Sequence, residues 1–137
     1  MSKQISLQYL AGFFDGEGCV SSELRTEGRK APYLRVSVTQ KHPEILQEFK
    51  RRFGGWIGEK RKGAVIGRCF MWQACTAKAY YLLQALLPFL QVKHRQAVVG
   101  MQLASRAMLN NKYKSISLAE FKLRRRLACK ISRLNHL

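Results

Sequence analysis

Two pairs of alternating segments constrain the fold of this chain more than any other feature. In residues 19–27 and 33–40, apolar and polar residues alternate with the period of two that is typical of a strand with one buried face. The turn sequence EGRKAP joins them, which predicts an antiparallel hairpin. A second hairpin is predicted from WIGEK at 56–60 and AVIGRCFMWQAC at 64–75, on either side of RKG. The alternation gives the first hairpin a buried face of Val20, Leu24, Leu34, Val36 and Val38.

Segments whose apolar residues have helical spacing lie between and after these hairpins. It recurs at 7–16, 43–53, 77–90, about 93–109 and about 117–135. Gly18 is expected to end the first helix, Pro43 to begin the second and Thr76 to cap the third, while Ser117 and Glu120 form a capping box for the last. This order predicts one α+β domain over residues 1–137, with its core at about 7–107 and a basic C-terminal helix. Helices would cover one face of an antiparallel sheet and leave the other face open.

The charge of the chain points to a polyanionic partner. Lys and Arg total 25 against 8 Asp and Glu, a formal net charge of +17. Because the cations are spread over the whole chain, nucleic acid is favoured over a membrane surface, and no apolar run is long enough to span a bilayer. The four cysteines have neither disulfide-framework nor zinc-finger spacing. No signal-peptide pattern precedes Leu7, so we expect a protein that is not secreted and works in an organelle or a bacterial cytoplasm.

The segment YLAGFFDGEG, residues 9–18, departs from ordinary helix composition in two ways. Gly12 and Gly16 lie four residues apart on one face, where another helix backbone could approach closely. Glu17 lies at the negative end of the helix dipole, which costs a carboxylate about 0.3–1 kcal/mol unless a cation is nearby. The simpler alternatives are tight helix packing inside a monomer for the glycines and a solvated carboxylate before a capping glycine for Glu17.

Residues LAGFFDGEG resemble the motif of the LAGLIDADG homing endonucleases. Five letters match the name of that family, and the resemblance continues through VTQK after the second strand, PFLQVKHRQA after the second hairpin, and the order of the elements. It covers about residues 7–107 and is closest to single-motif members that act as homodimers. The resemblance implies a saddle-shaped antiparallel sheet and a dimer in which the motif helix packs against its symmetry mate. The expected interface residues are Leu10, Gly12, Phe13 and Gly16.

The resemblance also implies an active site for hydrolysis of DNA phosphodiesters. Glu17 matches the acidic position that binds metal in the family, with Gly16 beside it, and Mg2+ is the expected ion, with Mn2+ as the alternative. Gln40 would position the attacking water, and Lys93 would lie near the scissile phosphate. Asp15 cannot share the helix face of Glu17 and is assigned either a structural role or one of supporting the residues around the metal.

One polar position of this pocket remains open. Where the family pattern has a basic residue four after the glutamine, this chain has Glu44, and either His94 or Arg95 could take its place.

The expected partner is double-stranded DNA, with no small-molecule cofactor and no membrane. The polar faces of the strands would read base edges, and the basic loop at 112–114 and the run at 122–130 would hold flanking phosphates. The expected contacts are Ser21, Glu23, Arg25, Tyr33, Arg35, Ser37, Lys60, Arg61, Lys62, Arg68, Lys112 and Lys114. The function predicted is site-specific cleavage of a long pseudo-palindromic target. The alternative is a nucleic-acid binder that does not cleave, either an intron RNA maturase or a transcription regulator.

Overall fold

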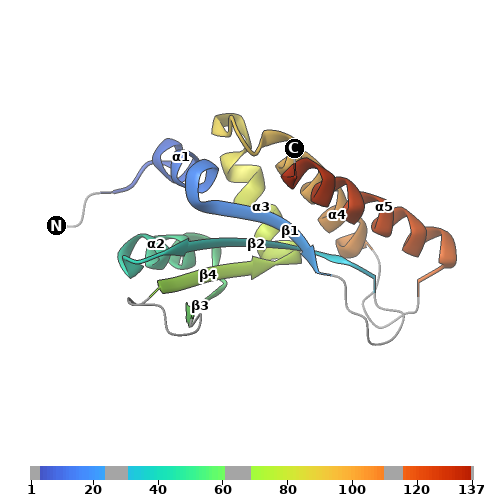
Figure 1. The fold of residues 1–137 in the computed structure, drawn as a ribbon, viewed down its shortest axis with the longest axis horizontal. Helices are drawn as coiled ribbons and strands as arrows, with labels where there is room; N and C mark the ends of the chain where they lie inside the picture. Colours follow the sequence, from blue (N-terminus) through green and yellow to red (C-terminus); the bar gives the residue numbers. More distant parts are fainter. Residues whose placement is uncertain (1–3, 24–30, 61–68, 110–115, 137) are drawn as a thin grey trace.

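The structure, a computed structural model, describes residues 4–23, 31–60, 69–109 and 116–136. Four strands and five α-helices follow the order that the sequence predicts (Figure 1). The elements are α1 (Leu7–Glu17), β1 (Gly18–Glu23), β2 (Tyr33–Gln40), α2 (Pro43–Phe53), β3 (Trp56–Lys60), β4 (Cys69–Cys75), α3 (Thr76–Leu86), the 3-10 turn η1 (Leu87–Phe89), α4 (His94–Leu109) and α5 (Leu118–Asn135). None of the described helices is long and apolar enough to cross a membrane.

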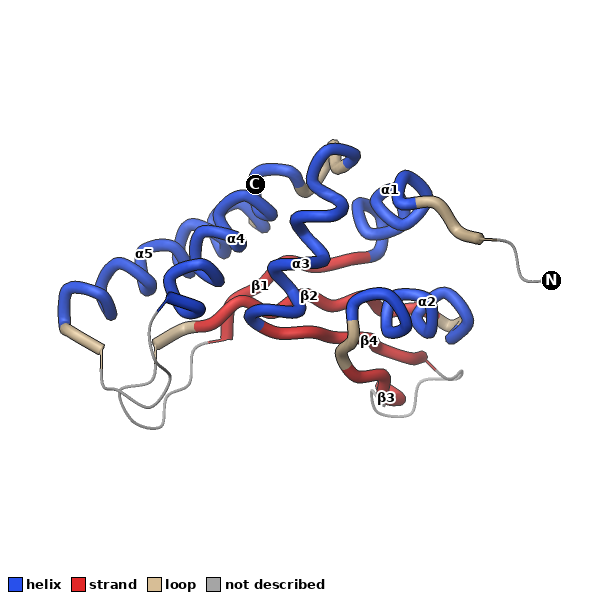
Figure 2. The backbone as a smooth tube through the Cα atoms, turned by 180° about the vertical axis from the view of Figure 1, so that it is seen from behind, coloured by secondary structure: helices blue, strands red, loops and turns tan. Residues whose placement is uncertain are grey.

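The strands form one antiparallel sheet in the order β1-β2-β4-β3. The two hairpins therefore join through their inner strands β2 and β4, where Ser37 pairs with Gln73. The helices pack on one face of this sheet, and the described chain leaves the other face uncovered (Figures 1 and 2). The expected α+β architecture is confirmed.

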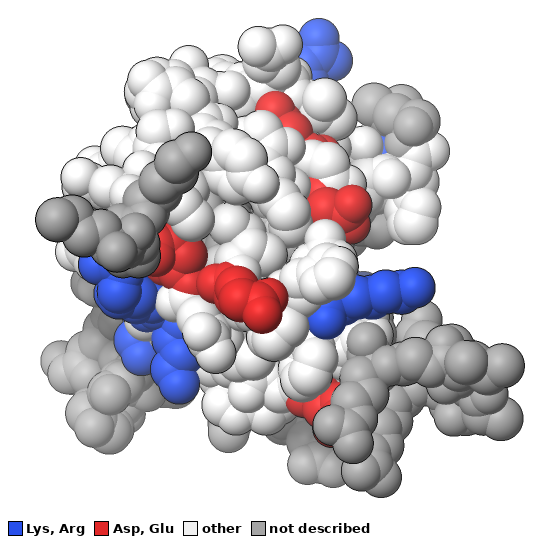
Figure 3. All heavy atoms as spheres, turned by 90° about the vertical axis from the view of Figure 1, so that its left-hand side faces the viewer, with Lys and Arg blue, Asp and Glu red and all other residues white. Residues whose placement is uncertain are grey.

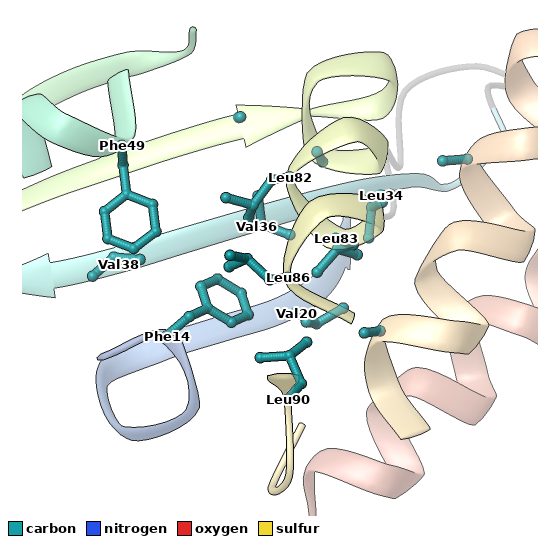
Figure 4. Close-up of a cluster of buried hydrophobic side chains, with 14 of the residues drawn as sticks. Phe14, Val20, Leu34, Val36, Val38, Phe49, Leu82, Leu83, Leu86 and Leu90 are labelled. Atoms are coloured by element: carbon teal, nitrogen blue, oxygen red, sulfur yellow. The ribbon is translucent and has the colours of Figure 1, made fainter. Parts of the chain in front are cut away.

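The core fills the space between the sheet and the helices. Val36 and Val38 point from β2 toward Phe14 of α1, Phe49 of α2 and Leu82 of α3 (Figure 4). All five are fully buried. Burial of such side chains contributes about 1.5–3 kcal/mol each, so this layer provides the main stabilisation of the sheet against the helices. The alternation of β2 is confirmed, because its even-numbered residues from Leu34 to Val38 are buried and its odd-numbered residues are partly exposed.

The junction between α1 and β1 has no linker. Glu17 is the last helical residue and Gly18 is the first residue of the strand. A Cβ atom at Gly18 would lie 2.5 Å from the Phe14 ring and 2.6 Å from its carbonyl oxygen. A glycine is therefore required here by the close approach of the chain, and it fixes the position of Glu17 at the edge of the sheet.

Two expectations for the third helix were wrong. Thr76 is not its cap: Cys75 holds that position without a side-chain hydrogen bond, and Thr76 is the first helical residue with a φ of 48°. Left-handed backbone in a β-branched residue is strained, and the strain occurs where β4 passes directly into α3. The helix also stops at Leu86, because Pro88 has no N–H to continue the α-helical pattern and the chain tightens into η1.

Candidate active site and nucleic-acid interface

The C-terminal end of α1 carries the motif carboxylates. Ser6 begins the helix by accepting a hydrogen bond from the Tyr9 amide at 3.1 Å, and Glu17 ends it with an exposed side chain. The last turn of α1 contains no basic residue of its own. The negative end of the helix dipole favours a cation, and here that cation has to come from another segment of the chain or be a bound ion.

Asp15 is bound by the loop that precedes α4. Its carboxylate accepts hydrogen bonds from the backbone N–H groups of Gln91 at 2.8 Å, Val92 at 3.2 Å and Lys93 at 3.0 Å. One side chain thus satisfies three amides at the start of a helix, in the manner of an anion bound by successive backbone N–H groups. Asp15 has the structural role expected for it, and it joins segments that lie more than 70 residues apart.

Lys93 lies at the same end of α1. Its ammonium group donates a hydrogen bond to the main-chain carbonyl of Asp15, and its side chain is partly buried. Lys93 therefore provides the positive charge that the last turn of α1 lacks, two residues before Glu17 in the helix. The structure places Glu17 and Lys93, two of the three expected catalytic residues, at one helix end.

Gln40 is placed near this end by strand register. Gly18 pairs with Val38, so the last residue of α1 and the last residue of β2 lie at the same end of the β1–β2 pair. The Gln40 side-chain oxygen accepts a hydrogen bond from the Lys41 amide at 2.7 Å. This contact fixes the orientation of its amide group in the free chain.

The side chains at the end of α1 fit a hard divalent cation only in part. Glu17 is an exposed carboxylate of the type that Mg2+ binds, whereas Asp15 is already occupied by three amides. Among the described residues, no three His, Cys, Asp or Glu side chains are grouped as a metal site. One chain therefore supplies one available carboxylate at the end of α1, and further oxygen ligands have to come from a second copy, from water or from a phosphate.

The structure does not select a third polar residue. Glu44 is exposed in the first turn of α2, and His94 and Arg95 are exposed at the start of α4, next to Lys93. Seen from the end of the molecule where α1 and α2 lie, acidic side chains gather on a largely uncharged surface with basic side chains at its sides (Figure 3). These two helices contain four of the eight acidic residues of the chain, Asp15, Glu17, Glu44 and Glu48.

The motif glycines lie on an exposed face of α1. A Cβ atom built at Gly12 or Gly16 would have no atom within 4 Å, so packing among the described residues of this chain does not require a glycine at either position. Of the other expected interface residues, Phe13 is partly buried and its ring packs against Phe49. Leu10 is fully buried in the core, because it lies on the opposite side of the helix, and its side chain is not available to a partner.

The open face of the sheet carries five of the expected DNA contacts. They alternate with the buried residues of β1 and β2 and are Ser21, Glu23, Tyr33, Arg35 and Ser37. The backbone of Lys60 ends β3. The remaining expected contacts, Arg25, Arg61, Lys62, Arg68, Lys112 and Lys114, lie outside the described residues, as does the side chain of Lys60.

Two of these expected DNA-contact residues form an ion pair with each other. The Arg35 guanidinium lies 2.7 Å from the Glu23 carboxylate, and both side chains are about one-third exposed. Within the described chain, the Arg35 Nε and the Gln73 Oε1 are buried atoms without a hydrogen-bond partner. A buried donor or acceptor without a partner costs about 1–3 kcal/mol.

Gln73 and Trp56 belong to the same open face and were not in the expected set. Gln73 pairs with Ser37 on one side and Trp56 on the other, and the Trp56 side chain is 55% exposed. The signal was present in the sequence, because the alternation of Trp72 and Ala74 as buried residues places Gln73 outward.

The fold and part of the sequence match known proteins. Residues 4–56 match the family model for a LAGLIDADG-like domain. A search of curated proteins gave no significant match.

Solved structures match over nearly the whole chain. An archaeal intron-encoded homing endonuclease, I-Vdi141I, solved in complex with DNA, has a TM-score of 0.76 at 21% identity, with 93% of this chain and 82% of that chain covered. The homing endonuclease I-CvuI, in complex with its target in the presence of calcium, gives 0.75 at 23% identity, with coverages of 93% and 80%. The homing endonuclease I-GzeII, in complex with a DNA target, gives 0.69 at 18% identity, and this chain spans 45% of its length.

These matches define the fold of the chain. The chain has the fold of the LAGLIDADG homing endonucleases, and its first 56 residues contain the segment that the family model describes. The resemblance to the LAGLIDADG family is therefore confirmed. In length, this LAGLIDADG-like chain corresponds to most of I-Vdi141I or I-CvuI and to about half of I-GzeII.

Proposed function

We propose that the protein is a metal-dependent, site-specific DNA endonuclease that cuts both strands of a duplex as a homodimer. The observation that carries this proposal is the arrangement at the end of α1, where Glu17 is the exposed last residue and the Lys93 ammonium group donates a hydrogen bond to the Asp15 carbonyl of the last turn. The similar proteins I-Vdi141I and I-CvuI are homing endonucleases solved with DNA, which supports the same substrate class.

Three residues of this chain would have separate roles in phosphodiester hydrolysis. Glu17 would hold a divalent cation, which supplies charge neutralisation and an activated water when bound. Gln40 would orient that water by a hydrogen bond from its side-chain NH2 group, while its side-chain oxygen accepts from the Lys41 amide. Lys93, held at the end of α1, would stabilise the extra negative charge on the phosphate in the transition state.

A twofold dimer would complete this site. Gly12 and Gly16 present an exposed helix face free of side chains, and a second copy of α1 could approach it closely. The two Glu17 carboxylates would then lie near the dyad, where each chain supplies the ligand that the other lacks. The two open sheet faces would together cover a long duplex site with related halves.

Replacement of Glu17 tests both the proposed DNA cleavage and the role of Glu17 as the metal ligand. A plasmid pool carrying randomised inserts is incubated with the purified protein in Mg2+ or Mn2+, and linear products are measured. We expect Glu17→Gln to bind the same DNA with a Kd within a few-fold of wild type, since the side chain keeps its size, but to cut at least about 1,000-fold more slowly because a metal ligand is lost.

Glu59→Gln is the matched control, because it removes an equal charge from an exposed position of β3 to which no part of the site is assigned. It should cut at a rate close to wild type. Equal cleavage by the Glu17 variant would exclude the proposed site. Tight binding to intron RNA without any nicking of DNA in either metal would support the alternative of a binder that does not cleave.

A further inference from the structure

Helix α5 carries the most basic surface among the described residues. Its exposed side includes five cations, which we call the α5 basic stripe: Lys122, Arg125, Arg126, Lys130 and Arg133. Their spacing places them on one face of the helix, opposite the buried residues Arg124, Ala128 and Ile131. From the first to the last cation, the stripe extends about 16 Å at the rise of an α-helix.

The stripe is not neutralised by the rest of the described chain. The single acidic residue of α5, Glu120, is directed inward and pairs with Arg106 of α4 and with Arg124 at 3.1 Å. None of the five stripe side chains has an ion pair or hydrogen bond within the described residues. Like charges four residues apart, such as Lys122, Arg126 and Lys130, destabilise a helix by about 0.2–0.5 kcal/mol per pair, so the stripe has an electrostatic cost until an anion covers it.

The helix is held firmly under this surface. Ser117 caps its start by accepting a hydrogen bond from the Glu120 amide at 3.1 Å, which is the serine half of the expected capping box, while the Glu120 carboxylate accepts from Arg106 and Arg124. The Glu120 carboxylate joins the helix to Arg106, and near the other end the Asn135 side chain donates to the Val20 carbonyl of β1 at 2.7 Å. The cations therefore stand on a fixed helix rather than on a tail.

The stripe faces away from the open face of the sheet. α5 lies in the helical layer, packed against α4 and β1, at the end of the molecule away from α2 (Figures 1 and 2). Its exposed side points away from both of these elements, whereas the open face lies on the far side of the sheet. This placement puts residues 122–130 in the helical layer rather than on the open face of the sheet.

We propose that the α5 basic stripe binds the phosphate backbone of a second segment of duplex DNA, so that one protein molecule bridges two segments. A row of Lys and Arg side chains without acidic partners in the described chain complements a duplex backbone, and it needs no particular base sequence. The exposed residues of the stripe include no aromatic side chain on which unpaired bases could stack, which disfavours single strands. The apolar side of α5 is buried against α4 and β1, so the helix cannot insert into a membrane surface.

Bridging of two duplexes tests this proposal without any cleavage. Donor-labelled and acceptor-labelled short duplexes of unrelated random sequence are mixed with the protein in EDTA, and energy transfer between them is measured against protein and salt concentration. Wild-type protein should give a transfer signal that falls steeply with salt. Arg126→Gln/Lys130→Gln should weaken bridging about tenfold or more, and the salt slope should fall by about 0.9 for each phosphate that the variant no longer neutralises.

The control variant removes the same charge elsewhere. Lys50→Gln/Lys78→Gln replaces two exposed lysines of α2 and α3 and should bridge like wild type. Bridging by the stripe variant at the wild-type level, or no bridging by wild type, would overturn the proposal. Inhibition of bridging by double-stranded RNA at lower concentration than by duplex DNA would overturn the assignment to DNA.

Cys129 allows a second measurement on a chain with all five cations intact. It is exposed between the cations of the stripe, and a photoreactive group attached to it should crosslink to DNA in the bridged complex. The same group on Cys19, which is exposed on β1, provides a comparison on the open sheet face. Crosslinking from Cys19 but none from Cys129 would contradict the proposal. Because both experiments are done without divalent metal, their outcome is independent of whether the protein cleaves DNA.

Discussion

At the scale of single residues, the two carboxylates of the motif have separate environments although only one residue lies between them. Asp15 is held by three backbone amides from the 91–93 loop, while Glu17 is exposed at the end of the helix. Successive positions two apart in a helix point about 200° apart, so one side chain faces the neighbouring loop and the other faces solvent. The geometry makes Asp15 a support for Lys93 and leaves Glu17 available for a cation.

Asp15→Asn should show how much the contact between Asp15 and the 91–93 loop stabilises the fold. An amide has one acceptor oxygen and no charge, so it cannot bind three N–H groups as a carboxylate does, and we expect a loss of about 1–3 kcal/mol in the free energy of unfolding. Hydrogen exchange at the amides of Gln91, Val92 and Lys93 should become faster. Gln8→Ala, at an exposed position of the same helix, should leave these amides unchanged.

A double-mutant cycle shows whether Asp15 also acts through Lys93. If Asp15 positions the Lys93 ammonium group, Asp15→Asn should slow DNA cleavage in the wild-type background and have little further effect in Lys93→Met. Equal losses in both backgrounds would mean that Asp15 only stabilises the fold.

At the scale of elements, α1 has glycines of two kinds. Gly18 is required by the chain itself, because a Cβ atom would meet Phe14 at 2.5 Å, whereas Gly12 and Gly16 border open space. Gly12→Leu should therefore leave the monomer folded, with a gain of up to about 1 kcal/mol in helix stability, but prevent close approach of a second α1. Light scattering should show a dimer for wild type and a monomer for Gly12→Leu.

Gly18→Ala is the contrasting change and should destabilise the fold itself, because it forces α1 away from β1. The dimer interface would have to lie elsewhere if Gly12→Leu remained dimeric with an unchanged dissociation constant.

The contact between α4 and α5 predicts a pH dependence. Hydrogen bonds from Arg106, and then from Arg124, hold the pKa of the Glu120 carboxyl below its ordinary range, and burial opposes them only in part. Because the folded pKa is the lower one, the ion pairs stabilise the fold above the ordinary glutamate pKa of about 4.3, and this stability is lost as the pH falls toward the folded value. Glu120→Gln should be less stable than wild type near pH 7, and the difference should shrink below about pH 4 in thermal denaturation. A difference that stays constant with pH would contradict this role.

Patterns within one element were predictable, and contacts between distant elements were not. The period of the apolar residues in β2, the helix start at Pro43 and the cap at Ser117 depend on neighbours along the chain, and each occurs where expected. The binding of Asp15 to the loop before α4 depends on how α1 and α4 meet, which no local pattern reports. The error at Thr76 has the same cause, because the direct passage from β4 into α3 overrides its preference for a capping position.

At the scale of the whole molecule, the open face of the sheet and the exposed side of α5 differ in how their cations are paired. The sheet presents an open face on which Arg35 is already paired with Glu23, and α5 presents cations on the helical side that have no acidic partner in the described chain. The net charge of +17 predicted a polyanionic partner, but it carried no information on which surface of the protein binds that partner. The end of α1 and α2, with four acidic residues, is where a divalent cation is expected to bind between the protein and DNA phosphates.

The central claim is that two copies of this chain, each with one Glu17 site, cut both strands of one duplex. Cleavage selection from a randomised duplex library in Mg2+, followed by sequencing of the cut ends, tests it most directly. We predict recovered targets with two related half-sites around a central cut, and no products when EDTA replaces the metal. Products without twofold symmetry in the recovered targets, cleavage that persists in EDTA, or enrichment by binding with every duplex left intact would contradict the claim.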